Sequence, residues 1–349
     1  MNRDSQLTLP PAPNLIGAIR SGFDAITNHI WLILFPIILD LFLWIGPRIK
    51  LTSLINNTSE ELFRVSASQD PSLVELLGPM QEIWAEFAEQ FNMLVLLRSY
   101  PVGITSLVVA KSAATSPVAD LVGSWGIGSL WGELLRVLIG SWEIGSLSGV
   151  LLAFVVISLI GIAGGTLFFL VVAQAAVIGD ISWKQVFSEW PWSSLQMFFL
   201  AILWTVIFLV ITIPGSFLLS LVILSGVSYG QCALLVFAGA VFWLILPLVF
   251  SPHGIVLNQN SFFESVKISA NLARKTLPST VLFVLAVFLL SKGLDILWSY
   301  PKPTSWFLLV GILGHAFVTT GLLAASFVYY RDALRWMEEM VKVRDLKTV

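Results

Sequence analysis

The stretch from Ser261 to Trp298 decides the fold, and it reads SFFESVKISANLARKTLPSTVLFVLAVFLLSKGLDILW. It opens with a capping-box pattern, in which Ser261 and Glu264 satisfy the first free N–H groups of a helix. After a short basic joint, an apolar run extends from Val281 to Trp298. The pattern predicts a helix that lies along the membrane surface, followed by a helix that spans the membrane.

The predicted surface helix is amphipathic. Its polar residues are spaced three, four and three apart, so they share one helical face. They are Glu264, Lys267, Asn271 and Arg274, and the residues expected on the opposite face are Phe262, Val266, Ala270 and Ala273.

The composition identifies a polytopic membrane protein. Apolar residues make up 57% of the chain and charged residues 11%, against about 25% charged residues in a typical soluble domain. The net charge of −2 provides no overall field that would attract nucleic acid, so nucleic acid is excluded as a partner. The one cysteine, Cys232, cannot form an internal disulfide.

We predict an all-α fold with six transmembrane helices. The expected spans are about 30–47, 150–178, 195–224, 232–256, 281–298 and 306–330. The corresponding regions are a tail and surface helix at 1–29, span 1 at 30–47, an insertion at 48–148, a five-span membrane domain at 149–335 and a tail at 336–349.

The insertion at 48–148 is expected to be a helical extracytoplasmic cap that rests on the membrane. Helix-start patterns occur at Thr58 and at Asp70. A GSWxIGSLxG repeat occurs at 123–132 and again at 140–149, which indicates two glycine-hinged elements. Two interpretations stay open: a small duplication in a surface segment, or a ligand groove lined by Trp125 and Trp142.

The distribution of lysine and arginine predicts the orientation. With the N-terminus in the cytoplasm, the inside segments carry eleven of these residues, and the short outside loops carry only Lys302. We therefore expect both termini on the cytoplasmic side of a bacterial cytoplasmic membrane.

Three amphipathic segments, 14–28, 181–190 and 261–275, each precede a predicted helical hairpin. They suggest three units of surface helix plus hairpin, with the insertion placed in the first unit. The alternative is that cytoplasmic loops between hairpins are commonly amphipathic.

Two groups of residues near the third unit carry a family resemblance. They are Ser265, Ser269 and Leu272 before span 5, and Tyr329-Tyr330-Arg331-Asp332 at the end of span 6. On these weak motifs, over about 180–335, the chain resembles bacterial membrane families that include YciC-like proteins and the membrane domain found attached to glycerophosphodiester phosphodiesterases. The resemblance implies a six-span helical fold. It does not imply phosphodiesterase activity, because that chemistry belongs to a separate soluble domain, and the long insertion departs from the resemblance.

Ionisable residues inside predicted spans form a candidate polar cluster of Asp40, Lys292, Asp295 and His315, because a charge in hydrocarbon is costly unless it is paired. Asp40 and Lys292 lie at similar depths, so an ion pair between spans 1 and 5 is one interpretation. The others are that Lys292 reaches the interface and pairs only with Asp295, or that the group forms a proton or ion site. His315 is expected to hydrogen-bond to a neighbouring helix, or to bind a ligand or relay protons.

Pro214, Gly215 and Pro247 interrupt predicted spans 3 and 4 and form a candidate broken-helix site. Broken spans free backbone groups that can bind a substrate. The alternative is a simple kink, in which neighbouring groups satisfy the backbone. His253, near the inner end of span 4, is expected to be a polar cap.

No nucleotide-binding, nucleophile or metal-ligand motif occurs in the sequence, so we expect no enzyme activity and no cofactor. The first hypothesis is a non-catalytic scaffold or accessory subunit that organises membrane lipids or other membrane-protein subunits. The second is a transporter or lipid-handling protein that uses spans 3 and 4. A wide cavity that reaches Pro214, His315 and Asp40 would favour the second, and a closed bundle packed at Gly161 and Gly165 would favour the first.

Overall fold

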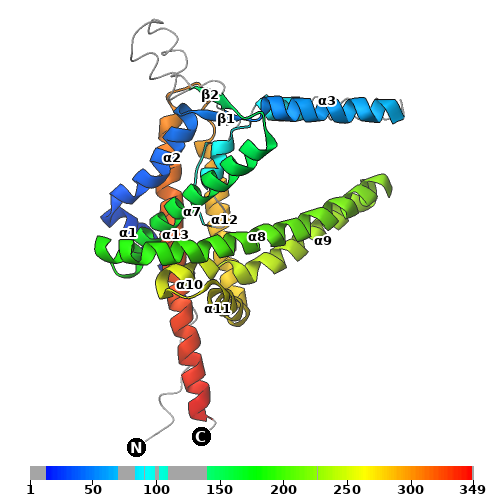
Figure 1. Ribbon diagram of the computed structural model, residues 1–349. Coiled ribbons are helices and arrows are strands. Elements are labelled where there is room, and N and C mark those ends of the chain that lie inside the picture. Colours follow the sequence, from blue (N-terminus) through cyan, green and yellow to red (C-terminus); the bar gives the residue numbers. More distant parts are fainter. Residues whose placement is uncertain are drawn as a thin grey trace, which may run out of the picture.

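A computed structural model describes residues 13–69, 83–89, 91–98, 102–108, 140–225 and 227–347 (Figure 1). Three of the sequence expectations lie outside these ranges: the tail at 1–12, the helix start at Asp70 and the first repeat copy at 123–132. The second copy contains a short strand and then the start of a helix.

Helices make up nearly all of the described structure, as the predicted all-α class requires. A two-stranded parallel ribbon of β1 (Arg48–Lys50) and β2 (Ser141–Glu143) is the exception, and it was not predicted. The α-helices and the short 3-10 helices (η) are α1 (Leu15–Asn28), η2 (Ile30–Ile33), α2 (Leu34–Ile45), α3 (Thr52–Gln69), η3 (Met93–Arg98), α7 (Leu147–Val177), α8 (Trp183–Ser225), α9 (Val227–Ile245), η5 (Leu246–Leu248), α10 (Ser251–Asn258), α11 (Phe262–Lys275), α12 (Leu277–Trp298) and α13 (Leu308–Lys347).

Five segments of the described chain are helical, long and apolar enough to cross a membrane, which confirms a polytopic membrane protein. They are Leu147–Val177, Trp183–Leu218, Cys232–Asn258, Leu277–Trp298 and Leu308–Val343. A sixth crossing arises if α1 and the segment Ile30–Ile45, which meet at a bend of 95°, count together. The predicted number of six spans equals only this upper count and stays a prediction, because span 1 was expected at 30–47 without the surface helix at 14–28.

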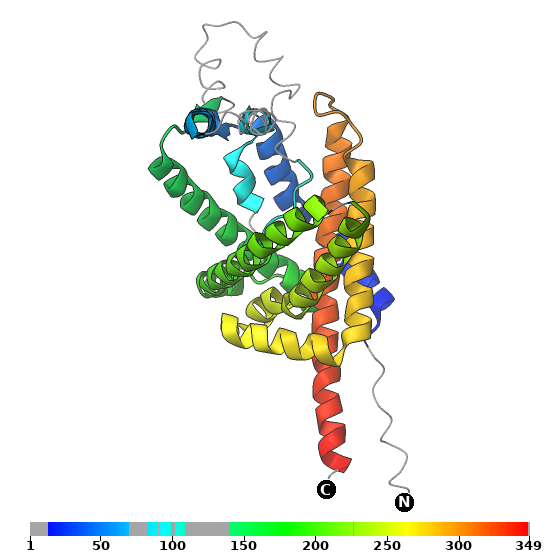
Figure 2. The same ribbon diagram turned by 90° about the vertical axis from the view of Figure 1, so that its right-hand side faces the viewer.

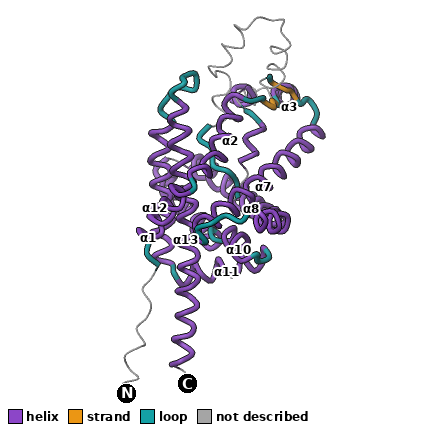
Figure 3. The backbone as a smooth tube through the Cα atoms, turned by 90° about the vertical axis from the view of Figure 1, so that its left-hand side faces the viewer, coloured by secondary structure: helices purple, strands orange, loops and turns teal. Residues whose placement is uncertain are grey.

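The helix bundle has two distinguishable sides. The described chain begins and ends on one side, which we call the terminal side (Figures 1 and 2). The loop 299–307 and the β1–β2 ribbon lie at the opposite end, which we call the distal side (Figure 3).

Helix α13 is the central element, and α1 packs closely against it. A Cβ atom built at Gly22 would lie 2.3 Å from the backbone nitrogen of Ala325, so the two backbones touch. A Cβ at Gly321 would lie 2.7 Å from the ring of Phe23. Glycine at these two positions lets α1 lie directly on α13.

The continuous helix α8 contradicts two sequence expectations, which are a separate surface helix at 181–190 and a surface helix in every one of the three predicted units. Residues 181–190 were expected as a separate surface helix, but from Trp183 onward they form the first turns of a continuous helix that ends at Ser225. Pro191 and Pro214 both lie inside this helix. Together α8 and α9 form a hairpin, the α8–α9 arm, which projects away from α12 and α13 (Figures 1 and 2). The predicted three-unit organisation therefore lacks a separate surface helix in its second unit.

Helix α11 begins as predicted, and its most buried side lies next to the centre of the predicted apolar face. The Ser261 side chain accepts a hydrogen bond from the Glu264 backbone N–H, as the capping pattern requires. The predicted polar residues Glu264, Lys267, Asn271 and Arg274 are all exposed, and Ala273 of the predicted apolar face is buried. Ser265, Ser269 and Leu272 are buried as well, whereas Phe262, Val266 and Ala270 are only half-buried. Ser269 turns inward because α11 meets a break in the backbone of the preceding helix, and this break needs hydrogen-bonding partners.

Part of the long insertion runs back among the membrane helices. We call the described residues 91–98 and 102–108 the re-entrant segment. A Cβ atom at Gly161 of α7 would lie 3.0 Å from the Leu97 Cα, and one at Gly165 would lie 2.8 Å from the Gly103 Cα. Both glycines occupy the middle of the 31-residue helix α7. The small-residue pair at Gly161 and Gly165 therefore receives this segment rather than another helix.

Asn92 connects the start of the re-entrant segment to the distal ribbon. Its buried side-chain oxygen accepts hydrogen bonds from the backbone N–H groups of Ile49 and Leu94, both at 3.1 Å. Non-helical backbone is tolerated at membrane depth only where protein groups surround and satisfy it. The insertion is therefore more than the surface cap that we expected, because part of it completes the core.

Adjacent glycines on α7 test this packing. We predict that Gly165→Ala lowers the melting temperature in detergent, because its new methyl group meets the backbone of Val102 and Gly103, with a cost of about 1–3 kcal/mol. The matched control is Gly164→Ala, whose methyl group would meet nothing within 4 Å. The melting temperature of each variant is measured by heating the protein and using size-exclusion chromatography to detect what stays folded. Equal melting temperatures for the two variants would contradict the assigned packing.

Candidate functional site

Asp40 is completely buried on α2, and the re-entrant segment supplies its hydrogen-bond donors. The carboxylate accepts hydrogen bonds from the backbone N–H groups of Leu107 and Val108, each at 3.1 Å, and from the Ser106 hydroxyl. The ion pair with Lys292, one of the interpretations of the sequence, is not formed. Backbone N–H groups from a neighbouring segment occupy the carboxylate instead.

Lys292 pairs with Asp295 on its own helix, which is the second interpretation of the sequence. The Lys292 ammonium group lies 3.1 Å from one Asp295 carboxylate oxygen, and the Lys292 side chain is 63% exposed. The other Asp295 oxygen lies 2.8 Å from His315 Nδ1. These contacts join α12 to α13, so Asp295 is paired on both sides.

His315 connects the two parts of the predicted cluster. It is only 4% exposed, and its Nε2 atom has no hydrogen-bond partner among the described residues. Asp40 lies within electrostatic range of its ring. One turn along α13, the Thr319 hydroxyl accepts a hydrogen bond of 2.8 Å from the Thr105 hydroxyl of the re-entrant segment. The four candidate residues therefore gather in one region, arranged around His315.

This polar cluster is closed. Asp40 and His315 are buried, and neither lines the two grooves described below. Among the described residues, no group of three or more His, Cys, Asp or Glu side chains is arranged to hold a metal ion. The cluster's hydrogen bonds fasten α2, α12, α13 and the re-entrant segment together, which is a structural role.

The candidate broken-helix site does not form one site. Pro214 lies within the continuous helix α8, so span 3 is not interrupted. A Cβ atom at Gly215 would lie 2.3 Å from the Phe237 ring, so this glycine allows α8 and α9 to approach each other. Gly215 lines a groove on the arm, whereas Pro247 does not.

Pro247 does mark a true break, because α9 ends at Ile245 and α10 begins only at Ser251. Ser269 of α11 satisfies the backbone at this break. Its hydroxyl donates to the Pro247 carbonyl at 2.7 Å and accepts from the Phe250 N–H at 3.1 Å. A neighbouring side chain thus repairs the kink, as the second interpretation of the sequence predicts.

A second buried polar cluster surrounds the break and was not predicted. His253 Nε2 lies 2.7 Å from the Ser326 hydroxyl, so His253 is part of the core and is not a terminal cap. The Ser265 and Tyr330 hydroxyl groups both point toward Gly254, and neither has a hydrogen-bond partner in the described structure. The spacing of Ser265, Ser269 and Leu272 along one helical face was the sequence signal for this cluster.

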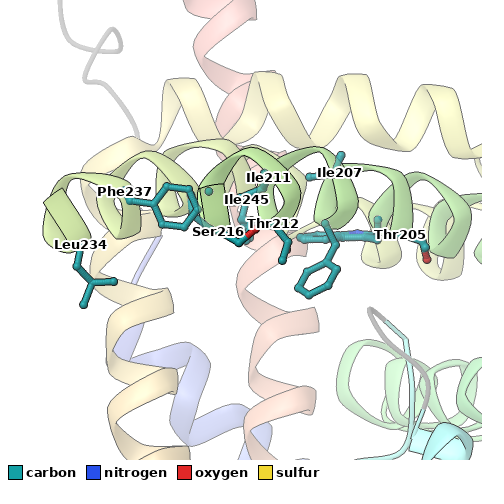
Figure 4. Close-up of a pocket in the computed structure, with 12 residues that line it drawn as sticks. Thr205, Ile207, Ile211, Thr212, Ser216, Leu234, Phe237 and Ile245 are labelled. Atoms are coloured by element: carbon teal, nitrogen blue, oxygen red, sulfur yellow. The ribbon is translucent and has the colours of Figure 1, made fainter. Parts of the chain in front are cut away.

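The α8–α9 groove is an apolar cavity of about 710 Å³ on the arm. Its walls are aliphatic and aromatic apart from a few polar groups, chiefly hydroxyls. Figure 4 shows side chains from both helices around it, among them Ile207, Ile211 and Thr212 of α8 and Leu234, Phe237 and Ile245 of α9.

The α7–α8 groove is a second cavity, of about 560 Å³, and the re-entrant segment forms part of its wall. Thr205 lines both grooves, so they lie on neighbouring sides of α8. Among the described residues, Arg98 is the only charged residue that lines the second groove. Sequence reasoning missed Arg98, although it ends the apolar stretch Phe91–Leu97, and that position was the available signal.

Comparisons with protein-family models, with curated proteins and with solved structures find no match to this chain. The family resemblance drawn from the serines and tyrosines therefore stays a prediction. These residues do converge, since Ser265, Ser269, Leu272, Tyr329 and Tyr330 are all buried around α10.

Substitutions of two serines on one face of α11 test whether Ser269 satisfies the backbone at the break near Pro247. We predict that Ser269→Ala is destabilising by about 1–3 kcal/mol, because it leaves the Phe250 N–H and the Pro247 carbonyl unpaired. Ser265→Ala removes a buried hydroxyl that has no partner, so its melting temperature should equal or exceed that of the wild type. Thermal unfolding in detergent measures both, and the reverse order of stability would refute the assignment.

Proposed function

We propose that this integral membrane protein handles lipids through the two grooves along α8. The observation that carries the proposal is that both grooves are mainly apolar and meet at Thr205. Their volumes of about 710 and 560 Å³ fall within the range of roughly 300–1,000 Å³ that is typical of small-molecule sites. The proposal includes no catalytic step.

The position of the grooves supports a lipid ligand over a soluble one. Helix α8 is one of the segments long and apolar enough to cross a membrane. Its side chains beside the grooves are exposed and apolar, for example Ile202, Phe208 and Ile213. A ligand that reaches these grooves from the membrane meets hydrocarbon-like walls, which suit acyl chains.

The sequence analysis named two features that separate a scaffold from a transporter or lipid-handling protein. The structure agrees with each of them only in part. An apolar groove does reach Gly215, beside Pro214, but His315 and Asp40 do not line it. Gly161 and Gly165 are closely packed, but against the re-entrant segment rather than against another helix. None of the four residues of the polar cluster lines either groove, which favours lipid handling over ion or proton transport.

Our proposal also retains the predicted location, a bacterial cytoplasmic membrane with both termini in the cytoplasm. The distribution of lysine and arginine supports this orientation. The described chain ends lie on one side of the bundle, which is compatible with an even number of crossings (Figure 2).

One observation favours the scaffold hypothesis as a second function. The α8–α9 arm projects from the bundle with large apolar side chains exposed, including Val210, Phe217, Leu235 and Val236 (Figure 1). Another membrane-protein subunit could pack on this surface. A protein partner that co-purifies in fixed stoichiometry would support this second function.

A pair of substitutions on α8 tests lipid handling. Ile202 is 46% exposed and lines the α7–α8 groove, whereas Leu209 is 49% exposed and lines neither groove. We predict that Ile202→Trp reduces the amount of lipid retained by the purified protein, because the indole ring narrows the groove. Native mass spectrometry from a mild detergent, on protein purified from its own membranes, measures the retained lipid.

Leu209→Trp is the matched control, and it should retain as much lipid as the wild type. Melting temperatures of both variants verify that each is folded. A wild-type protein without bound lipid, or equal retention by the two variants, would overturn the proposal.

A further inference from the structure

Arg98 occupies an unusual position for a charged residue. It is the last residue of η3, and the backbone of the preceding Leu97 packs on Gly161 in the middle of α7. A charged side chain at membrane depth costs several kcal/mol unless another group compensates it, so such residues mark functional sites by default.

No protein group compensates Arg98 within the described part of the chain. Its guanidinium group makes no hydrogen bond and no ion pair with any described residue. The acidic residues of the nearby polar cluster are already occupied, since Asp40 binds residues 106–108 and Asp295 binds Lys292 and His315. The positive charge therefore lacks an anion from the described protein.

The residues around Arg98 indicate the kind of molecule that could supply an anion to it. The groove wall is formed by α7, α8 and the re-entrant segment, and its other polar side chains are Ser158 and Thr205. The Thr205 hydroxyl already donates to the Ala201 carbonyl, which leaves the Ser158 hydroxyl as a second donor for a ligand. Every other lining residue is apolar, including Phe154, Ile162 and Ile202.

A single cation in an apolar groove matches an amphipathic anion. The planar guanidinium group binds phosphate oxygens through two parallel hydrogen bonds. The apolar walls favour acyl chains and give little to a free phosphate ion. We infer that Arg98 is the headgroup site for an anionic phospholipid, whose phosphate binds the guanidinium while its chains lie along α7 and α8.

This inference rests on the proposed lipid-handling function and makes it specific. A phospholipid bound in this way has its phosphate beside the middle of α7, below its usual level in the bilayer. The groove thus draws the headgroup of an anionic lipid toward the centre of the membrane.

The test compares two lipids with identical chains, phosphatidylglycerol and phosphatidylcholine, titrated separately into delipidated full-length protein. Native mass spectrometry measures each apparent affinity for the wild type, Arg98→Gln and Arg98→Lys. We expect the wild type to prefer phosphatidylglycerol by about tenfold, because the choline cation of phosphatidylcholine offsets the phosphate charge that Arg98 binds. Arg98→Gln should lose this preference and still bind phosphatidylcholine, and Arg98→Lys should recover part of it.

Arg64→Gln is the control for general electrostatic attraction, because Arg64 is an exposed arginine on α3 that pairs with Glu61. It should keep the preference of the wild type. Loss of preference in this control, or no preference in the wild type, would overturn the inference while lipid handling stands. Failure of both lipids to bind would also remove the proposed function. Displacement of phosphatidylglycerol by glycerol 3-phosphate, at the same concentration, would identify a soluble phosphate as the ligand and overturn the lipid assignment.

Discussion

The structure depends on how unpaired backbone groups are satisfied inside a membrane. The N–H groups of Leu107 and Val108 lie outside any helix, and the buried Asp40 carboxylate accepts both of their hydrogen bonds. Without such an acceptor, each buried N–H group would cost about 1–3 kcal/mol. Ser269 does the same for the break at Pro247, on the terminal side. In both places a polar side chain from another element makes irregular backbone compatible with burial.

This constraint also positions the grooves. Because Asp40 and Thr319 hold the end of the re-entrant segment, its first half lies against Gly161 of α7. There it forms part of the wall of the α7–α8 groove and carries Arg98 into that groove. The polar cluster therefore holds the wall of the groove in place, although Asp40 and His315 line neither groove.

Periodicity and hydropathy predicted the long helices well, since α7, α12 and the start of α13 fall within a few residues of their expected positions. Asp40 was recognised as a buried charge, but its partner was missed because backbone N–H groups have no signature in a sequence. The inward turn of Ser269 was missed for a similar reason, since it depends on a break in another helix. Arg98 was overlooked because a long polar insertion predicts a surface cap.

Disulfide trapping measures most directly whether Asp40 docks the re-entrant segment. The hydroxyl groups of Thr105 and Thr319 lie 2.8 Å apart, so the pair Thr105→Cys and Thr319→Cys, in a Cys232→Ala background, should oxidise readily. The yield of disulfide is measured by counting the thiols that still react with maleimide after mild oxidation. The control pair is Thr105→Cys with Thr320→Cys. We predict a high yield of disulfide for the first pair, and we expect this yield to fall sharply when Asp40→Asn is added. A yield that Asp40→Asn leaves unchanged would contradict the role assigned to this carboxylate.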